Sequence, residues 1–153
     1  MKVDELNWRI LGCLQENARM SNAEIGRRVG ISSPAVSERI KKMEDLGVIQ
    51  GYIANIDPIE TGLQLRAIIT IRAFMGKLRP FIDKVKTFEE VLNCYRITGN
   101  ENIVMEVVFR DQKHMEAFID QIIVYGESKT QIVLSHVVNH APIKQKLLFK
   151  REV

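Results

Sequence analysis

The sequence predicts an α+β protein in which a helical N-terminal part precedes a part of the order β-α-β-β-α-β. Two observations lead to this prediction. Up to residue 47, apolar residues recur at the three- and four-residue spacing of amphipathic helices. Beyond residue 62, segments that alternate apolar and polar residues are interleaved with further helical segments. The 153-residue chain is long enough for two small domains, which we expect at 1–62 and 63–153.

The first two helices have clear start signals. Asp4 is placed to cap the first, whose apolar stripe comprises Leu6, Ile10, Leu11 and Leu14. Ser21 and Glu24 have the spacing of a capping box, which predicts the start of a second helix. Gly30 ends that helix, because glycine tolerates the left-handed backbone common at helix C-termini.

A third helix follows almost immediately. Ser32 or Ser33 caps it, and Pro34 lies in its first turn, where the missing N–H costs nothing. Its apolar stripe comprises Val36, Ile40 and Met43. The face away from this stripe is hydroxylic near its start and basic near its end, and carries Ser33, Ser37, Glu38, Lys41 and Lys42.

The segment 48–56 reads as two short strands bent at Gly51, and 58–62 as a connector. Two strands in this position form the wing of a winged helix-turn-helix, and we expect Trp8 and Tyr52 to pack between the first helix and this wing. In such a motif the second helix of the pair, here the third helix of the chain, enters the major groove of double-stranded DNA. The expected DNA-binding residues are Arg27, Arg28, Ser32, Ser33, Pro34, Ser37, Glu38, Lys41 and Lys42, with Arg39 as a further phosphate contact.

The second half predicts a ferredoxin-like sandwich, in which two helices cover one face of an antiparallel sheet. We expect strands at 65–73, 91–98, 103–109 and 132–138, and helices around 81–88 and 115–123. The other face of such a sheet stays bare in one chain. Two copies that pack these faces together would bury it, so we expect a homodimer.

Several function classes find no support in the sequence. The net charge of +3 is too small to indicate a partner by itself. Cys13 and Cys94 lie in apolar stretches without metal-ligand spacing, so we expect both to be buried thiols. His136 and His140 are too far apart on an extended strand to share a metal. We expect no enzyme, no cofactor and no membrane partner, and, because signal peptide and spanning segment are missing, a cytoplasmic, nucleoid-associated protein.

Motifs spread over most of the chain carry a family resemblance. They comprise Ile10-Leu11, 14–19, 23–26, 29–32, 36–40, 46–49, Gly51-Tyr52, Asp57-Pro58, Thr61-Gly62 and 95–99. From about residue 4 to about residue 138 the chain resembles the Lrp/AsnC, or feast/famine, family of prokaryotic transcription regulators. The resemblance implies DNA binding by the N-terminal domain, and dimers that often assemble into octamers through the C-terminal domain.

The resemblance also implies that a small effector, usually an amino acid, binds between C-terminal domains. The matching pocket residues are Thr98, Gly99, Asn100, Glu101, Asn102, Ser128 and Thr130. The turn departs from the family pattern, which has an aromatic residue and then an aspartate after the glycine. Here Glu101 and Asn102 take those positions, so the charge expected to meet a ligand ammonium group is displaced or absent.

Three functions therefore stay open at the level of the sequence. The first is a sequence-specific regulator controlled by an effector. The second is an architectural protein that bends or wraps DNA with little sequence preference, through the avidity of an octamer. The third, from another class, is a small-molecule-binding or enzymatic ferredoxin-like protein whose helical domain contacts protein.

Overall fold

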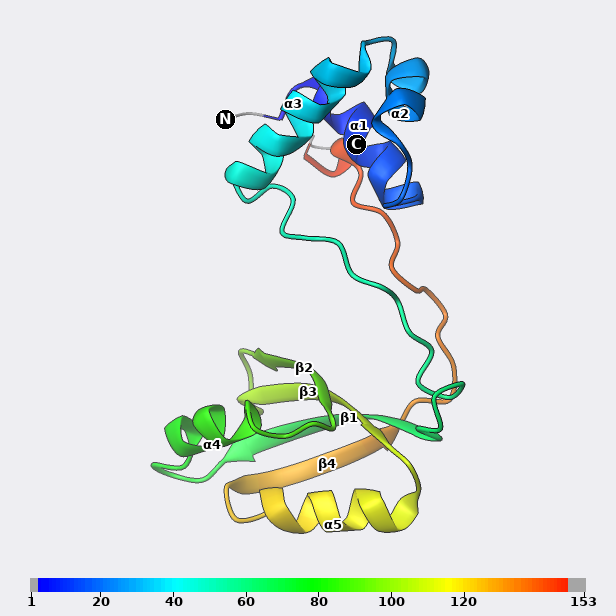
Figure 1. Cartoon of the computed structure of the whole chain (residues 1–153). Helices are drawn as coiled ribbons and strands as arrows, with labels where there is room; N and C mark the ends of the chain where they lie inside the picture. The colour runs from blue at the N-terminus through cyan, green and yellow to red at the C-terminus, as the bar shows by residue number, and fades with distance from the viewer. Residues whose placement is uncertain (1–2, 149–153) are drawn as a thin grey trace, which may run out of the picture. The chain divides into compact units, whose positions relative to one another are not determined.

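The computed structural model describes residues 3–148, which form two compact units (Figure 1). Among these residues, unit 1 comprises 3–54 and 138–148, and unit 2 comprises 55–137. The sequence predicted a single boundary near residue 62 and assigned the tail to the second domain. The division differs because the C-terminal segment, residues 138–148, returns to the first helix. Unit 1 is therefore built from both ends of the chain.

Unit 1 contains the three predicted helices, α1 (Glu5–Glu16), α2 (Asn22–Val29) and α3 (Ser33–Asp45). The expected caps are present: a side-chain oxygen of Asp4, Ser21 or Ser32 accepts a backbone N–H in the first turn of each helix. The helices enclose a core of Ile10, Cys13, Met20, Ile25, Val29, Val36 and Met43. This core confirms the predicted stripes and holds α2 and α3 as a helix-turn-helix.

The turn between α2 and α3 depends on two glycines. Gly30 has φ +83°, a left-handed backbone conformation that residues with a Cβ rarely adopt. Gly26 lies where the turn crosses α2, and a Cβ there would come within 2.5 Å of the Ile31 carbonyl oxygen. Glu24 makes only half of the predicted capping box: its backbone N–H donates to Ser21, whereas its carboxylate pairs with Arg28.

The predicted wing is not formed as two strands. Residues 48–57, here called the extended segment, contain no strand and pair with none among residues 3–148. The backbone–backbone hydrogen bonds found for this segment lie at its start, where Val48 and Ile49 donate to the Met43 carbonyl oxygen. Tyr52 nevertheless packs as expected, because it lines a groove together with Trp8 and donates to Glu44. The extended segment lies against α1 without becoming a β-ribbon.

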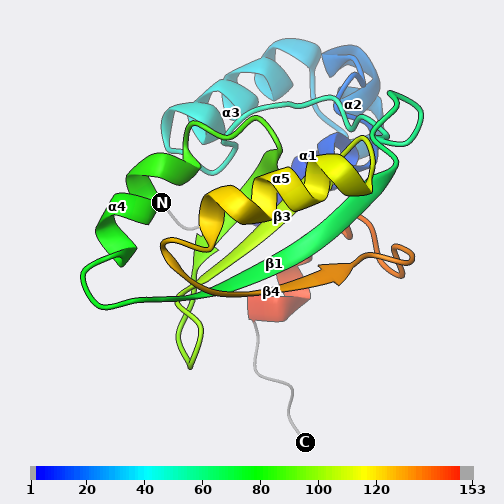
Figure 2. The same cartoon turned by 90° about the horizontal axis from the view of Figure 1, so that it is seen from below.

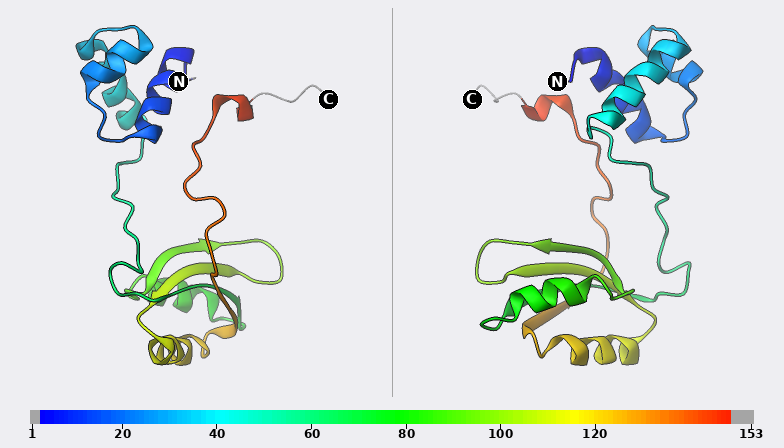
Figure 3. Two further views of the ribbon diagram at one scale, coloured as in Figure 1. Left: turned by 90° about the vertical axis from the view of Figure 1, so that its right-hand side faces the viewer. Right: turned by 60° about the vertical axis from the view of Figure 1, so that its left-hand side comes forward.

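Unit 2 is the predicted α+β sandwich. Its elements are β1 (Leu65–Ala73), α4 (Leu78–Val85), β2 (Val91–Arg96), β3 (Ile103–Phe109), α5 (Gln112–Ile122) and β4 (Gly126–Ile132). The strands form an antiparallel sheet of order β2-β3-β1-β4. Both helices lie on one face of this sheet (Figures 2 and 3). They close a core that includes Ala67, Ile69, Ile71, Phe81, Met105, Phe109, Phe118 and Ile122.

Two expectations for unit 2 were wrong. The last strand is Gly126–Ile132 rather than 132–138, because pairing with β1 selects the more polar segment. Residues 133–138 are a connector that lies outside the sheet. Cys94 is exposed rather than buried, because β2 is an edge strand with little cover, whereas Cys13 is buried as expected.

Candidate DNA interface and effector pocket

The exposed face of α3 is the candidate DNA interface. Val36 and Met43 are fully buried and orient the helix, so that Ser37, Lys41 and Lys42 are exposed on the opposite side. The other residues predicted for this surface are also accessible: Arg27, Arg28, Ser32, Pro34 and Glu38 are exposed, and Ser33 is half-buried. The structure thus brings hydroxyl groups and cations together on one accessible side of a helix-turn-helix, the arrangement that suits base and phosphate contacts.

The cations differ in how strongly they are held. Arg39 is engaged inside unit 1, because Nη1 donates to Asp4 at 2.8 Å and to Asn7 at 3.0 Å. Arg28 is held by Glu16 at 2.9 Å and Glu24 at 3.0 Å, and these carboxylates raise the pKa of its guanidinium. Arg39 therefore joins α3 to α1, and its role as a phosphate contact stays a prediction.

Arg27, Lys41 and Lys42 are more available to phosphates than Arg28. Among residues 3–148, no carboxylate pairs with Arg27 or Lys42. Lys41 pairs with Asp45 at 3.4 Å, with both side chains more than half exposed. Such an exposed pair is weak, so Lys41 can exchange it for a phosphate.

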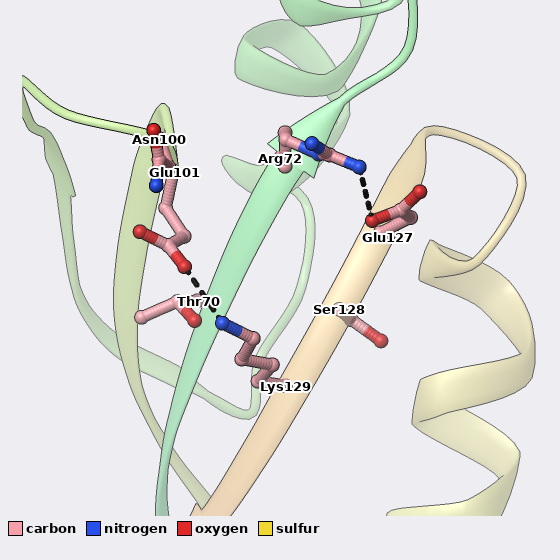
Figure 4. Close-up of a pocket in the computed structure, with 7 residues that line it drawn as sticks. All are labelled: Thr70, Arg72, Asn100, Glu101, Glu127, Ser128 and Lys129. Atoms are coloured by element: carbon pink, nitrogen blue, oxygen red, sulfur yellow. Dashed lines mark hydrogen bonds and ion pairs between the residues drawn. The ribbon is translucent and has the colours of Figure 1, made fainter.

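A second polar site lies in unit 2, on the sheet face that the helices leave uncovered. It is a cavity of about 310 Å³ lined by Thr70, Arg72, Asn100, Glu101, Glu127, Ser128 and Lys129. Glu101 and Lys129 meet beside Thr70 at 3.0 Å, and Arg72 meets Glu127 at 2.6 Å (Figure 4). Two carboxylates and two cations thus converge from β1, β4 and the β2–β3 turn.

The pKa of Glu101 is lowered by the cations around it. The hydrogen bond from Lys129 makes the largest contribution, and the charges of Lys129 and Arg72 act in the same direction. The carboxylate is therefore ionised at neutral pH, and the pocket contains matched charges of both signs.

The turn residues predicted for an effector separate into two groups. Asn100 and Glu101 line the cavity, whereas Thr98, Gly99 and Asn102 are not among the residues that line it. The Oδ1 atom of Asn102 accepts from the Ala73 N–H at 2.8 Å, and its backbone N–H donates to Ile71. Asn102 therefore fixes the turn against the end of β1. The carboxylate that this turn places in the cavity wall is that of Glu101.

Ser128 and Thr130, which were predicted to line the pocket, lie on the face of β4 opposite to Glu127 and Lys129. Ser128 pairs with Ile71 and Thr130 with Ile69, so both hydroxyl side chains share the helix-covered face of the sheet. Figure 4 shows the Ser128 hydroxyl directed away from the Glu101–Lys129 pair, although Ser128 contributes to the cavity wall. The alternate residues Glu127 and Lys129 face the cavity instead.

Four lining residues were missed in the sequence: Thr70, Arg72, Glu127 and Lys129. Thr70 and Arg72 alternate with the apolar Ile69 and Ile71 along the first strand, and this alternation was the available signal. Glu127 and Lys129 were missed because the last strand was placed six residues too late.

The uncovered sheet face also carries a charged cluster between β1, β2 and β3. Arg66 pairs with Glu106, which also accepts from Asn93 at 2.8 Å. Burial acts to raise the pKa of Glu106, but the hydrogen bonds from Asn93 and Arg66 outweigh it, and the pKa is lowered. Arg66 and Asn93 thus balance and hydrogen-bond the Glu106 carboxylate within the chain.

Other kinds of site find little in the structure. In the part of the chain that the structure describes, no three His, Cys, Asp or Glu side chains come together as a metal site. No helix there is both long and apolar enough to cross a bilayer.

Comparison with known proteins identifies both halves. Residues 3–44 match the AsnC-type helix-turn-helix domain, and residues 66–143 match the Lrp/AsnC ligand binding domain. The HTH-type transcriptional regulator AldR of Mycobacterium tuberculosis is 31% identical over 150 residues, covering 93% of this chain and 83% of that protein. An uncharacterized HTH-type transcriptional regulator of Pyrococcus furiosus is 34% identical over 132 residues, covering 85% of this chain and 88% of that protein.

Solved structures agree with these matches. A transcriptional regulator of Neisseria meningitidis, crystallised as an L-Met complex, superposes with a TM-score of 0.90 at 25% identity, covering 97% of this chain and all of that one. LrpC of Bacillus subtilis gives a TM-score of 0.85 at 26% identity, covering 90% of this chain and 99% of that one. The relatives named here for their activity are transcriptional regulators and not enzymes. Because the helix-turn-helix and the ligand-binding domain both match family models, the chain belongs to the Lrp/AsnC family of DNA-binding transcription regulators.

Proposed function

We propose that this regulator binds specific double-stranded DNA sites through α3, and that an amino acid bound at the cavity of unit 2 controls this binding. The observation that carries the proposal is the pairing of opposite charges in that cavity, Glu101 with Lys129 and Arg72 with Glu127.

The chemistry of the cavity suits a zwitterion. An α-amino acid presents an ammonium and a carboxylate group a few ångströms apart, which requires an acceptor and a cation at a similar separation. Glu101 or Glu127 offers the acceptor, and Arg72 offers a planar donor suited to a carboxylate. A ligand that enters would exchange two exposed ion pairs for two of its own. The amino acid in the N. meningitidis complex supports this ligand class.

The pocket lies at the uncovered sheet face, which gives it a route to control assembly. We propose that this face, with the exposed Tyr95 and the half-buried Ile68, packs against a second copy in a homodimer. Further association into octamers, as in the family, would place ligands between subunits. Light scattering with and without candidate amino acids measures the oligomeric state directly.

A thermal-shift screen of the amino acids tests the effector. A ligand that binds the folded chain raises its unfolding temperature by mass action, as expected for at least one amino acid at millimolar concentration. The variant Glu101→Gln should lose this shift, while Asp120→Asn on the exposed side of α5 should retain it. If no amino acid stabilises the parent chain, effector control is overturned, and an architectural role without effector gains support.

A footprinting experiment tests sequence-specific DNA binding. We expect protection of discrete sites, and expect Ser37→Glu to abolish it by placing a carboxylate against base edges and phosphates, without unfolding unit 1. Uniform coating of random DNA would favour the architectural role. Normal site protection by Ser37→Glu would show that the reading face lies elsewhere.

A further inference from the structure

The C-terminal segment is attached to unit 1 by a two-way contact. The Gln15 side chain on α1 donates through Nε2 to the Ile143 carbonyl oxygen at 3.1 Å. In return, the Ile143 N–H donates to Gln15 Oε1 at 2.7 Å. One carboxamide thus satisfies both backbone groups of Ile143, as a neighbouring strand would.

This contact seats the segment in an apolar groove. The groove has a volume of about 340 Å³ and lies between α1, the extended segment and Ile143. Its lining residues are Trp8, Leu11, Leu14, Gln15, Ala18, Val48, Ile49, Gln50, Gly51, Tyr52, Ile53 and Ile143. Ile143 forms one wall of the groove, and the single-turn helix η1 (Gln145–Leu148) follows it. The C-terminal segment of the same chain therefore completes the groove as one of its walls.

The seating is shallow. Ile143, Leu147 and Leu148 remain 68%, 70% and 69% exposed, whereas the core residues Ile10 and Ile25 are completely buried. Both hydrogen bonds to Gln15 are exposed to solvent, where water competes for the same groups. Contacts of this size hold a segment in place but release it readily.

We propose that the C-terminal segment is a releasable clasp, which binds the groove between α1 and residues 48–53 and gives unit 2 a second tether to unit 1. The chain leaves unit 1 after residue 54 and re-enters it at residue 138, so a docked segment tethers unit 2 at both ends. Release leaves one extended connector and widens the range of positions that the DNA-binding unit can reach. The docking itself does not rest on the proposed effector.

Trp8 reports on the clasp directly. It is the only tryptophan in the chain and lines the groove next to Ile143. In the full chain, Ile143→Asp should expel the segment, shift the Trp8 emission maximum to the red and increase quenching by acrylamide. Leu134→Asp introduces the same change at an exposed residue of unit 2 and should leave both signals unchanged. Identical Trp8 signals in Ile143→Asp and the parent chain would overturn the proposal.

Amide hydrogen exchange gives a second, independent measurement. The Ile143 amide should be protected in the parent chain and lose that protection in Gln15→Leu, which keeps an apolar stem but removes both hydrogen bonds. An unprotected Ile143 amide in the parent chain would show that the segment is not docked in solution. Loss of protection on dilution of the parent chain would assign the occupant to a second copy, and would overturn the intrachain clasp.

Solution scattering tests the tether. Release in Ile143→Asp should increase the radius of gyration of the full chain relative to Leu134→Asp at the same oligomeric state. An unchanged radius, with Trp8 exposed, would overturn the role of the clasp as a second tether.

Discussion

Nη1 of Arg39, in the middle of α3, lies 2.8 Å from Oδ2 of Asp4, the residue that caps α1 through its other carboxylate oxygen. The same nitrogen donates to Oδ1 of Asn7, which is only 3% exposed. One arginine therefore joins the start of the first helix to α3, whose exposed face is the candidate DNA interface. It fixes the orientation of α3 from within unit 1.

Arg39→Met keeps the length of the side chain but removes these hydrogen bonds. The buried Oδ1 of Asn7 then loses the hydrogen bond that it accepts from Arg39, so we expect the free energy of unfolding of unit 1 to fall by about 1–2 kcal/mol. Urea unfolding followed through Trp8 measures the loss. Lys42→Met, an exposed change on the same helix, should stay within about 0.5 kcal/mol of the parent chain. Equal stability of the two variants would contradict an anchoring role for Arg39.

The same contact predicts a pH dependence. The hydrogen bond from Arg39, followed by that from the Asn7 N–H, lowers the pKa of Asp4 below its ordinary value of 3.8. A folded-state pKa below the unfolded one means that the contact stabilises fully above the unfolded value. The contribution is then lost as the pH falls through the lower, folded-state pKa. We expect Asp4→Asn to flatten this acid limb of the stability profile, whereas Asp45→Asn on α3 keeps it.

The turn of the helix-turn-helix makes a contrasting prediction for two glycines. Gly26→Ala places a Cβ within 2.5 Å of the Ile31 carbonyl oxygen, so the turn must shift, at a cost of roughly 2 kcal/mol and with loss of DNA binding. Gly12→Ala, in α1, meets nothing within 4 Å and should stabilise by roughly 0.5–1 kcal/mol through helix propensity. Thermal unfolding and DNA retention are measured on both variants. Normal DNA binding by Gly26→Ala would mean that α3 need not hold its present angle to α2.

A further prediction concerns salt. If Lys42 contacts one phosphate, its replacement by alanine weakens binding to all DNA sequences, and reduces the slope of log affinity against log salt by about 0.9. Lys113→Ala, an exposed change on α5, is the matched control. An unchanged slope in Lys42→Ala would remove this lysine from the interface.

Local signals were sufficient to predict unit 1. The caps at Asp4, Ser21 and Ser32 and the buried stripe of α3 are determined within a few residues along the chain, so they can be read from the sequence. The paired wing was wrong because strands need a partner for their hydrogen bonds. Residues 48–57 have apolar, strand-like composition but pair with no strand among the residues described.

The last strand could not be predicted in the same way. Residues 133–138 include exposed apolar side chains such as Leu134 and Val137, which made them look more strand-like than the polar segment before them. Pairing with β1 nevertheless selects Gly126–Ile132, and only this long-range register reveals that Lys129 faces Glu101. The charged pocket is a product of pairing between distant segments. The turn, which the family resemblance indicated, supplies only Asn100 and Glu101 of the residues that line this pocket.

The discontinuity of unit 1 has a consequence for biosynthesis. Residues 3–54 leave the ribosome first and contain the complete three-helix core, so the helix-turn-helix can fold before unit 2 exists. Ile143 is translated only after all of residues 55–137, so it cannot reach the groove beside Trp8 until the whole of unit 2 has been synthesised. Closure of the groove would then mark a chain whose translation has run through both units.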